Sequence, residues 1–174
     1  MMTAKVAFVA TFLLILVVVA FFLWSRHRTD AERTFKSTDD FILWLASEAV
    51  KDSDRQNHVR LDYSVESIKS VETILGQLHE QYTKNPSSVS VKGLGSAYGA
   101  YVGEVIRRSE PGARWERDDA VGGEKSYPLI WAAGHSYPLG WCQKRIIYGD
   151  GDNVWIKYYI LKERASRPKT SDSK

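Results

Sequence analysis

Three side chains in this sequence have the types and surroundings that acid–base chemistry needs: Glu104, His135 and Arg145. Glu104 lies within the apolar run AYGAYVGEVI, so it either faces solvent or pairs with a cation such as Arg107, Lys144 or Arg145. His135 lies in the segment GHSYP, which is typical of a surface loop. An enzyme would require these side chains to converge in a cleft, with the carboxyl and imidazole groups as acid and base.

Other arrangements of reactive residues do not match known sites. The four histidines are scattered, and no two share the i, i+4 spacing of helical metal ligands. In GLGSAYG three residues separate the second and third glycines, whereas a dinucleotide fingerprint has two. GDGDN lacks the later Gly and Glu of a calcium loop. Cys142 is the only cysteine, which excludes an intramolecular disulfide, and its neighbours Trp141 and Ile146 favour a place in the core. The sequence predicts neither a metal nor a cofactor.

Aromatic residues supply a different kind of candidate site. The chain has six Trp and nine Tyr among 174 residues. We expect those outside the core to form a recognition surface, and Trp131, Tyr137 and Trp141 are the candidates, although all of them could instead be core residues.

The segment that positions the whole chain is an uninterrupted apolar run at residues 6–24, VAFVATFLLILVVVAFFLW. As a helix its roughly 19 residues extend about 28 Å, which matches the hydrocarbon thickness of a bilayer. A cleaved signal peptide would have a shorter apolar region that ends in small residues, whereas this run ends in FFLW. The sequence therefore predicts a single transmembrane helix, preceded by a short tip at residues 1–5.

Charge around this run predicts the orientation. One lysine precedes it, whereas four basic residues follow within the range that biases topology: Arg26, Arg28, Arg33 and Lys36. Positive flanks stay inside, which places the remainder of the chain in the cytoplasm. The overall charge of +3 belongs to the first 28 residues, and the formally neutral remainder argues against a nucleic-acid partner.

Periodicity after a linker at residues 25–36 predicts an α+β domain at residues 37–164, in which several helices pack on a short antiparallel sheet. Ser37 or Thr38 starts one helix, Ser64 opens another, and residues 89–108 form a third. Gly95, Gly99 and Gly103 repeat every four residues in the third helix, so we expect it to be central, with a flat groove for a helix or sheet. ARWERDD and KSYPLIWAAG are expected to form the antiparallel strand pair.

The C-terminal part allows two readings. Pro138 suits the first turn of a helix, and residues 144–161 then form either two helices separated at GDGDN or a β-hairpin. The charge pattern of Lys157, Lys162, Glu163 and Arg164 favours two helices. Residues 165–174 are polar and predict a disordered tail.

Residues 61–161 resemble an uncharacterised bacterial α+β domain family. The resemblance rests on GAYVGEVIRR at residues 99–108, RW at residues 114–115, YPLGWCQKRI at residues 137–146, and the break at residues 149–153. It implies an α+β fold with a two-helix ending. The resemblance brings no activity and therefore no catalytic residues.

Together these features predict a small domain on a single membrane anchor that acts as a non-catalytic protein-binding or accessory module. The lipid bilayer is the expected partner of residues 6–24, and a protein is the expected partner of the domain. Two alternatives remain: a membrane-tethered enzyme that uses Glu104, His135 and Arg145, and an immunity-type protein that neutralises a toxin.

Overall fold

Five α-helices and one three-stranded antiparallel sheet make up residues 35–167, the part of the chain that the computed structural model describes. The helices are α2 (Thr38–Asp52), α3 (Ser67–Lys84), α4 (Val91–Ser109), α5 (Pro138–Tyr148) and α6 (Val154–Ser166). The strands are β1 (Arg114–Trp115), β2 (Leu129–Trp131) and β3 (Gly134–Ser136), in the order β1-β2-β3. The predicted α+β class is confirmed.

The predicted transmembrane helix at residues 6–24 lies outside the described residues, as do residues 25–34 and 168–174. Within residues 35–167, no helix is long and apolar enough to cross a membrane. Helix α6 continues to Ser166, so residues 165 and 166, which we predicted as the start of the tail, are helical.

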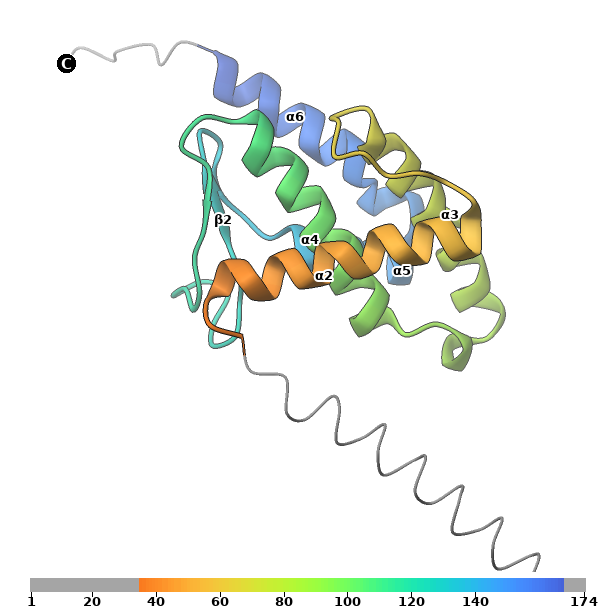
Figure 1. Ribbon diagram of the computed structural model, residues 1–174. Coiled ribbons are helices and arrows are strands. Elements are labelled where there is room, and N and C mark those ends of the chain that lie inside the picture. The colour runs from red at the N-terminus through yellow and green to blue at the C-terminus, as the bar shows by residue number, and fades with distance from the viewer. Residues whose placement is uncertain (1–34, 168–174) are drawn as a thin grey trace, which may run out of the picture. The chain divides into compact units, whose positions relative to one another are not determined.

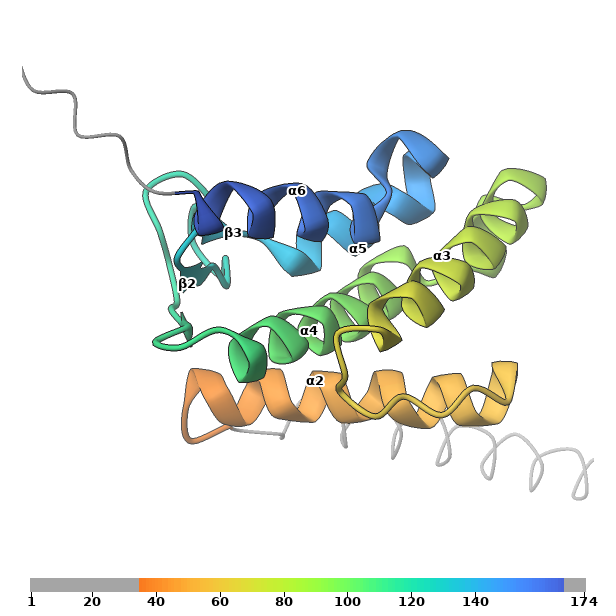
Figure 2. The same cartoon turned by 90° about the horizontal axis from the view of Figure 1, so that it is seen from above.

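Helix α4 is the centre of the domain. It packs against α2 on one side and against α5 on the other, so that α2 and the α5–α6 pair form the outer layers in Figure 2. The sheet lies beside the C-terminal end of α4 (Figure 1). Tyr98, Tyr101, Val102 and Ile106 of α4 are fully buried, as expected for the central helix.

The predicted glycine groove brings α5 onto α4. A Cβ atom at Gly99 would lie 2.3 Å from the Leu139 Cα atom, and one at Gly95 would lie 2.9 Å from the Gln143 Cα atom. Gly103 makes room for the Trp115 ring in the same way, since a Cβ atom there would lie 2.2 Å from it. Each glycine costs about 1 kcal/mol in helix propensity. In return Gly95 and Gly99 let the α5 backbone approach α4, and Gly103 admits the Trp115 ring.

Helix capping confirms two of the predicted boundaries. The Ser37 hydroxyl accepts a hydrogen bond from the Asp40 amide at 3.1 Å, which starts α2 where the sequence predicted. The Asn153 side chain accepts one from the Ile156 amide at 2.9 Å and starts α6. The C-terminal part therefore forms two helices, and the hairpin alternative is wrong.

The sheet contains one strand more than we predicted. Arg114 pairs with Ile130 and Trp115 with Leu129, which confirms the expected antiparallel pair. His135, however, belongs to β3, where it pairs with Ile130 of β2, and it does not lie in a loop. The prediction was wrong because β3 has three residues, only one of them buried, and a Gly at φ +90° in place of the β-branched residues that identify a strand.

Candidate functional site

A cleft of about 480 Å³ opens where the starts of α2, α4 and α5 meet the loop that precedes β2. Its volume falls within the usual range of ligand pockets, about 300–1,000 Å³. The lining combines aromatic and aliphatic groups with hydroxyl, amide and ammonium groups: Phe41, Lys92, Ser96, Gly122, Lys125, Ser126, Tyr127, Tyr137, Leu139, Gly140 and Gln143. Tyr137 is thus the one predicted binding residue that lines this cleft.

Asp119 holds the loop that forms one wall of the cleft. Its Oδ1 atom accepts hydrogen bonds from the amides of Val121 at 2.6 Å and Gly122 at 2.7 Å, and from the Tyr137 hydroxyl at 2.8 Å. A Cβ atom at Gly122 would lie 2.8 Å from the Tyr137 ring, so the loop closes tightly against this tyrosine. The wall is therefore tied to the start of α5.

His135 completes this cluster from β3. Its Nδ1 atom lies 2.6 Å from Oδ2 of Asp119, and the imidazole is 54% exposed. The hydrogen bonds from Gly122, Tyr137 and His135 hold the pKa of Asp119 well below its ordinary value of 3.8. The same bond to Asp119 raises the pKa of the Tyr137 hydroxyl. Asp119 is consequently a charged anchor for the wall.

Replacing Asp119 by Ala is expected to loosen this wall and leave the helical core intact. The amides of Val121 and Gly122 would lose their acceptor, so they should exchange hydrogen for deuterium at least several-fold faster, while α3 and α4 keep their protection. Glu124→Ala, on the same loop, is the control. Unchanged exchange at Val121 and Gly122 in Asp119→Ala would contradict the role given to Asp119.

Two ammonium groups give the cleft its charge. Lys92 belongs to the first turn of α4 and Lys125 to the loop, and no carboxylate lines the cleft in the described part of the chain. Lys125 has φ +59°, a left-handed conformation that non-glycine residues rarely adopt, and its amide donates to Oδ1 of Asp118 at 2.5 Å. Neither lysine forms an ion pair within residues 35–167.

Glu104 is buried, and the solvent-facing alternative is wrong. Only 1% of its side chain is exposed, and it receives hydrogen bonds from Arg107 at 2.7 Å and from the Trp115 indole at 2.8 Å. Burial raises the pKa of Glu104, but the bonds from Arg107 and Trp115 outweigh it and hold the pKa below the ordinary value of 4.5. Glu104 thus fixes β1 on the central helix as a carboxylate.

This pKa shift predicts how stability depends on pH. Because the pKa of Glu104 is lower in the folded chain, its contribution is complete above pH 4.5 and is lost as the pH falls through the folded value. Glu104→Gln should therefore lower the free energy of unfolding by about 2 kcal/mol at neutral pH and less in acid. Urea unfolding across this pH range measures the difference from wild type, with Glu48→Gln at an exposed pair as the control. A difference that stays constant with pH would contradict the assignment.

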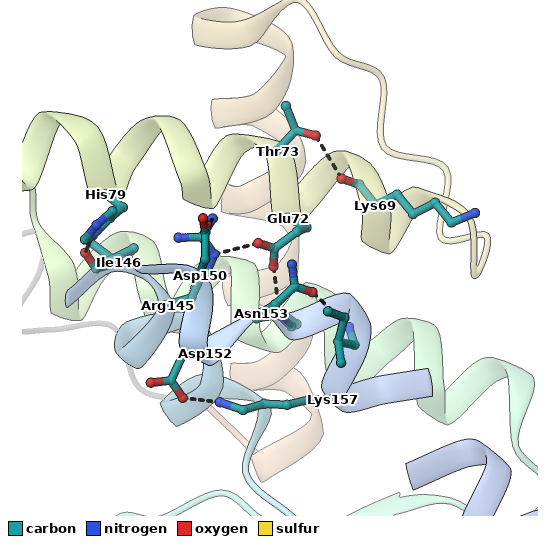
Figure 3. Close-up of polar contacts among 12 residues, drawn as sticks. Lys69, Glu72, Thr73, His79, Arg145, Ile146, Asp150, Asp152, Asn153 and Lys157 are labelled. Atoms are coloured by element: carbon teal, nitrogen blue, oxygen red, sulfur yellow. Dashed lines mark hydrogen bonds and ion pairs between the residues drawn. The ribbon is translucent and has the colours of Figure 1, made fainter. Parts of the chain in front are cut away.

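Arg145 belongs to a third, separate network (Figure 3). Its Nε atom donates to Glu72 of α3 at 2.5 Å, and Nη2 donates to Asp150 at 2.8 Å. The second oxygen of Glu72 accepts from the Val154 amide at 2.7 Å, at the first residue of α6. The structure therefore gives Glu104, His135 and Arg145 different partners, and no contact joins them within the described residues.

The remaining candidates occupy different surroundings. Trp131 is 6% exposed, and its indole donates to the Ser136 hydroxyl at 2.8 Å, so it is a core residue. Trp141 is half-buried and borders a shallow groove of about 300 Å³ next to Ile160 and Leu161 of α6. Cys142 is fully buried, as predicted, and burial raises the pKa of its thiol.

Sequence reasoning missed most of the cleft. Asp119, Lys92 and Lys125 look like ordinary surface charges in the sequence, because nothing in their spacing shows that the loop folds back over the start of α5. The signal that was present is Pro138, which placed a helix start beside Tyr137.

Comparison with known proteins gives no match to a family model, a curated protein or a solved structure. The resemblance of residues 61–161 to a bacterial domain family therefore gains no support.

Proposed function

We propose that this protein is a membrane-anchored, non-catalytic binding module whose cleft holds a short segment of a protein partner. The observation that carries the proposal is the cleft itself, which joins an apolar wall to polar groups and to two ammonium groups that form no ion pair within residues 35–167. Such a combination suits recognition, because apolar contact supplies affinity and a few polar groups fix orientation. A volume of about 480 Å³ suits a few side chains of a partner.

The anchor in this proposal is the apolar run at residues 6–24, with the domain on the cytoplasmic side. The protein should stay in the membrane pellet after an alkaline wash and enter solution only with detergent. Protease treatment of sealed cells tests the orientation, because a cytoplasmic domain is out of the protease's reach. Recovery of the chain in the alkaline supernatant contradicts the anchor, and cleavage of the domain in sealed cells contradicts the orientation.

A non-catalytic role is favoured over the enzyme alternative by the partners of the candidate residues. The carboxylate of Glu104 is already bonded to Arg107 and Trp115, and Arg145 is bonded to Glu72 and Asp150. His135 is bonded to Asp119 on the loop. The three residues therefore have separate partners and do not converge in one cleft, as the enzyme alternative requires.

Two matched glycine variants test the use of the cleft. Gly140 lines the cleft, and the nearest atom to a Cβ there would be 4.0 Å away, so Gly140→Phe should fill the cleft without disturbing the fold. Gly151 has no atom within 4 Å of a Cβ, so Gly151→Phe adds the same ring outside the cleft.

The experiment uses the intact chain in its own membranes, a reversible amine-reactive cross-linker and mass spectrometry. A discrete partner should be recovered with wild type and with Gly151→Phe, and should be lost with Gly140→Phe. Recovery of the same partner with all three proteins would place binding on another surface and contradict the proposal.

A further inference from the structure

We infer that the segment bound in the cleft is acidic: it carries a carboxylate next to an aromatic or aliphatic side chain. This inference rests on the proposed function, since it names the chemistry of the ligand at the same site.

The lining of the cleft carries two positive charges. Lys92 and Lys125 come from different elements, and both lack a carboxylate partner within residues 35–167. Three other cations of the described part do have carboxylate partners: Arg107 pairs with Glu104, Arg145 with Glu72, and Lys162 with Glu110. No carboxylate is among the lining residues of the described part, and the Asp119 carboxylate behind the wall is already bonded to Gly122, Tyr137 and His135. A lining with two cations therefore attracts an anion.

The helix ends at the cleft act in the same direction. The first amides of a helix have no acceptor within it, and the helix dipole places partial positive charge there. Neither α4 nor α5 has an acidic residue in its first turn or a side-chain cap, whereas α2 has Asp39, Asp40 and the Ser37 cap. Gly140, in the first turn of α5, lines the cleft and has no side chain to cover these amides.

The apolar wall specifies the rest of the ligand. The rings of Phe41 and Tyr127 lie 5.0 Å apart in a tilted contact, and Leu139 adds an aliphatic surface from α5. An anion alone would leave this wall exposed to water, so the apolar surface favours a ligand with an apolar side chain beside its carboxylate. Because the ammonium and apolar groups share a small cleft, the two ligand groups should be close neighbours in the partner sequence.

Selection from a random peptide library tests this chemistry. The full-length chain is held in nanodiscs of phosphatidylcholine, and displayed heptapeptides are selected against it, with Gly140→Phe as the counter-selection. The selected sequences should contain Asp or Glu within two positions of an aromatic or aliphatic residue. One selected peptide and its Asn or Gln counterpart are then titrated calorimetrically.

The acidic peptide should bind about tenfold more tightly than its amide counterpart, as expected for one charge-assisted contact. Lys92→Gln and Lys125→Gln should each lower the affinity for the acidic peptide by a similar factor and leave the affinity for the amide peptide unchanged. Lys144→Gln is the control, because Lys144 is an exposed lysine on α5 outside the cleft lining.

Three other results would overturn either the acidic ligand or the proposed function. Selected peptides that are neutral or basic, and indifferent to both lysine variants, overturn the acidic ligand and leave the peptide-binding function in place. Displacement of the acidic peptide when phosphatidylserine is added to the nanodiscs assigns the anion to a lipid headgroup and overturns the inference. Failure to select any peptide above the Gly140→Phe background contradicts the proposed function itself.

Discussion

Gly99→Ala should destabilise the domain by about 3 kcal/mol, at the upper end of what overpacking a core costs. The added methyl group would lie 2.3 Å from the Leu139 Cα atom and 2.6 Å from the Pro138 carbonyl oxygen. Both are backbone atoms, so no side chain can rotate away, and α5 would have to move off α4. Chemical denaturation of the full-length chain in detergent measures the loss.

Gly93→Ala is the matched control on the same helix. There a Cβ atom would meet only the Ser90 side chain, at 2.7 Å from its hydroxyl oxygen, and that hydroxyl can rotate. Because Ala is the better helix former by about 1 kcal/mol, this variant should be neutral or slightly stabilising. Equal losses of unfolding free energy in the two variants would contradict the role of Gly99 in the close approach of α5 to α4.

Arg145→Met should cost about 3–5 kcal/mol, the usual effect of removing one partner of a buried ion pair. Glu72 is 13% exposed and Arg145 is 6% exposed, so water cannot replace the guanidinium. Glu72 would keep only its bond to the Val154 amide, and the attachment of α6 to α3 and α5 would weaken (Figure 3). The free energy of unfolding is again the quantity to measure.

Arg114→Met makes the same substitution at an exposed pair. Arg114 and Glu116 are 64% and 41% exposed, and such pairs contribute at most about 1 kcal/mol. Adding Glu72→Met to Arg145→Met should recover part of the lost stability, because the stranded carboxylate is then absent. Similar losses for Arg145→Met and Arg114→Met would show that the Glu72 network contributes little.

The sequence predicts the helical framework because the signals for it are local. Ser37 with Asp39 and Asp40 predicts the start of α2, and Pro138 predicts the start of α5. The three glycines of α4 predict a close approach, although they do not reveal whether a helix or a sheet makes it. Caps, prolines and periodic glycines act within about one or two helical turns, so they can be recognised in the sequence alone.

Features that depend on distant segments were not predictable in this way. Glu72 looks like a surface residue of an amphipathic helix, because its partner Arg145 is 73 positions away in the sequence. The cleft depends on the fold-back of the loop onto Tyr137, which Asp119 holds through bonds that span up to 18 positions. The short strand β3 is defined by its pairing with β2, and its three residues carry no strand signal of their own.

The central claim is that the cleft holds a partner segment while the protein is in its membrane, and photo-cross-linking from the cleft tests it most directly. A diazirine-bearing lysine analogue replaces Lys92 in one protein and Lys144 in another, so both probes keep the charge and differ only in position. After irradiation of intact cells, the protein with the probe at Lys92 should yield one discrete adduct whose cross-linked peptide is acidic, and the protein with the probe at Lys144 should not. Identical adducts from both positions, or none from Lys92, would contradict the account.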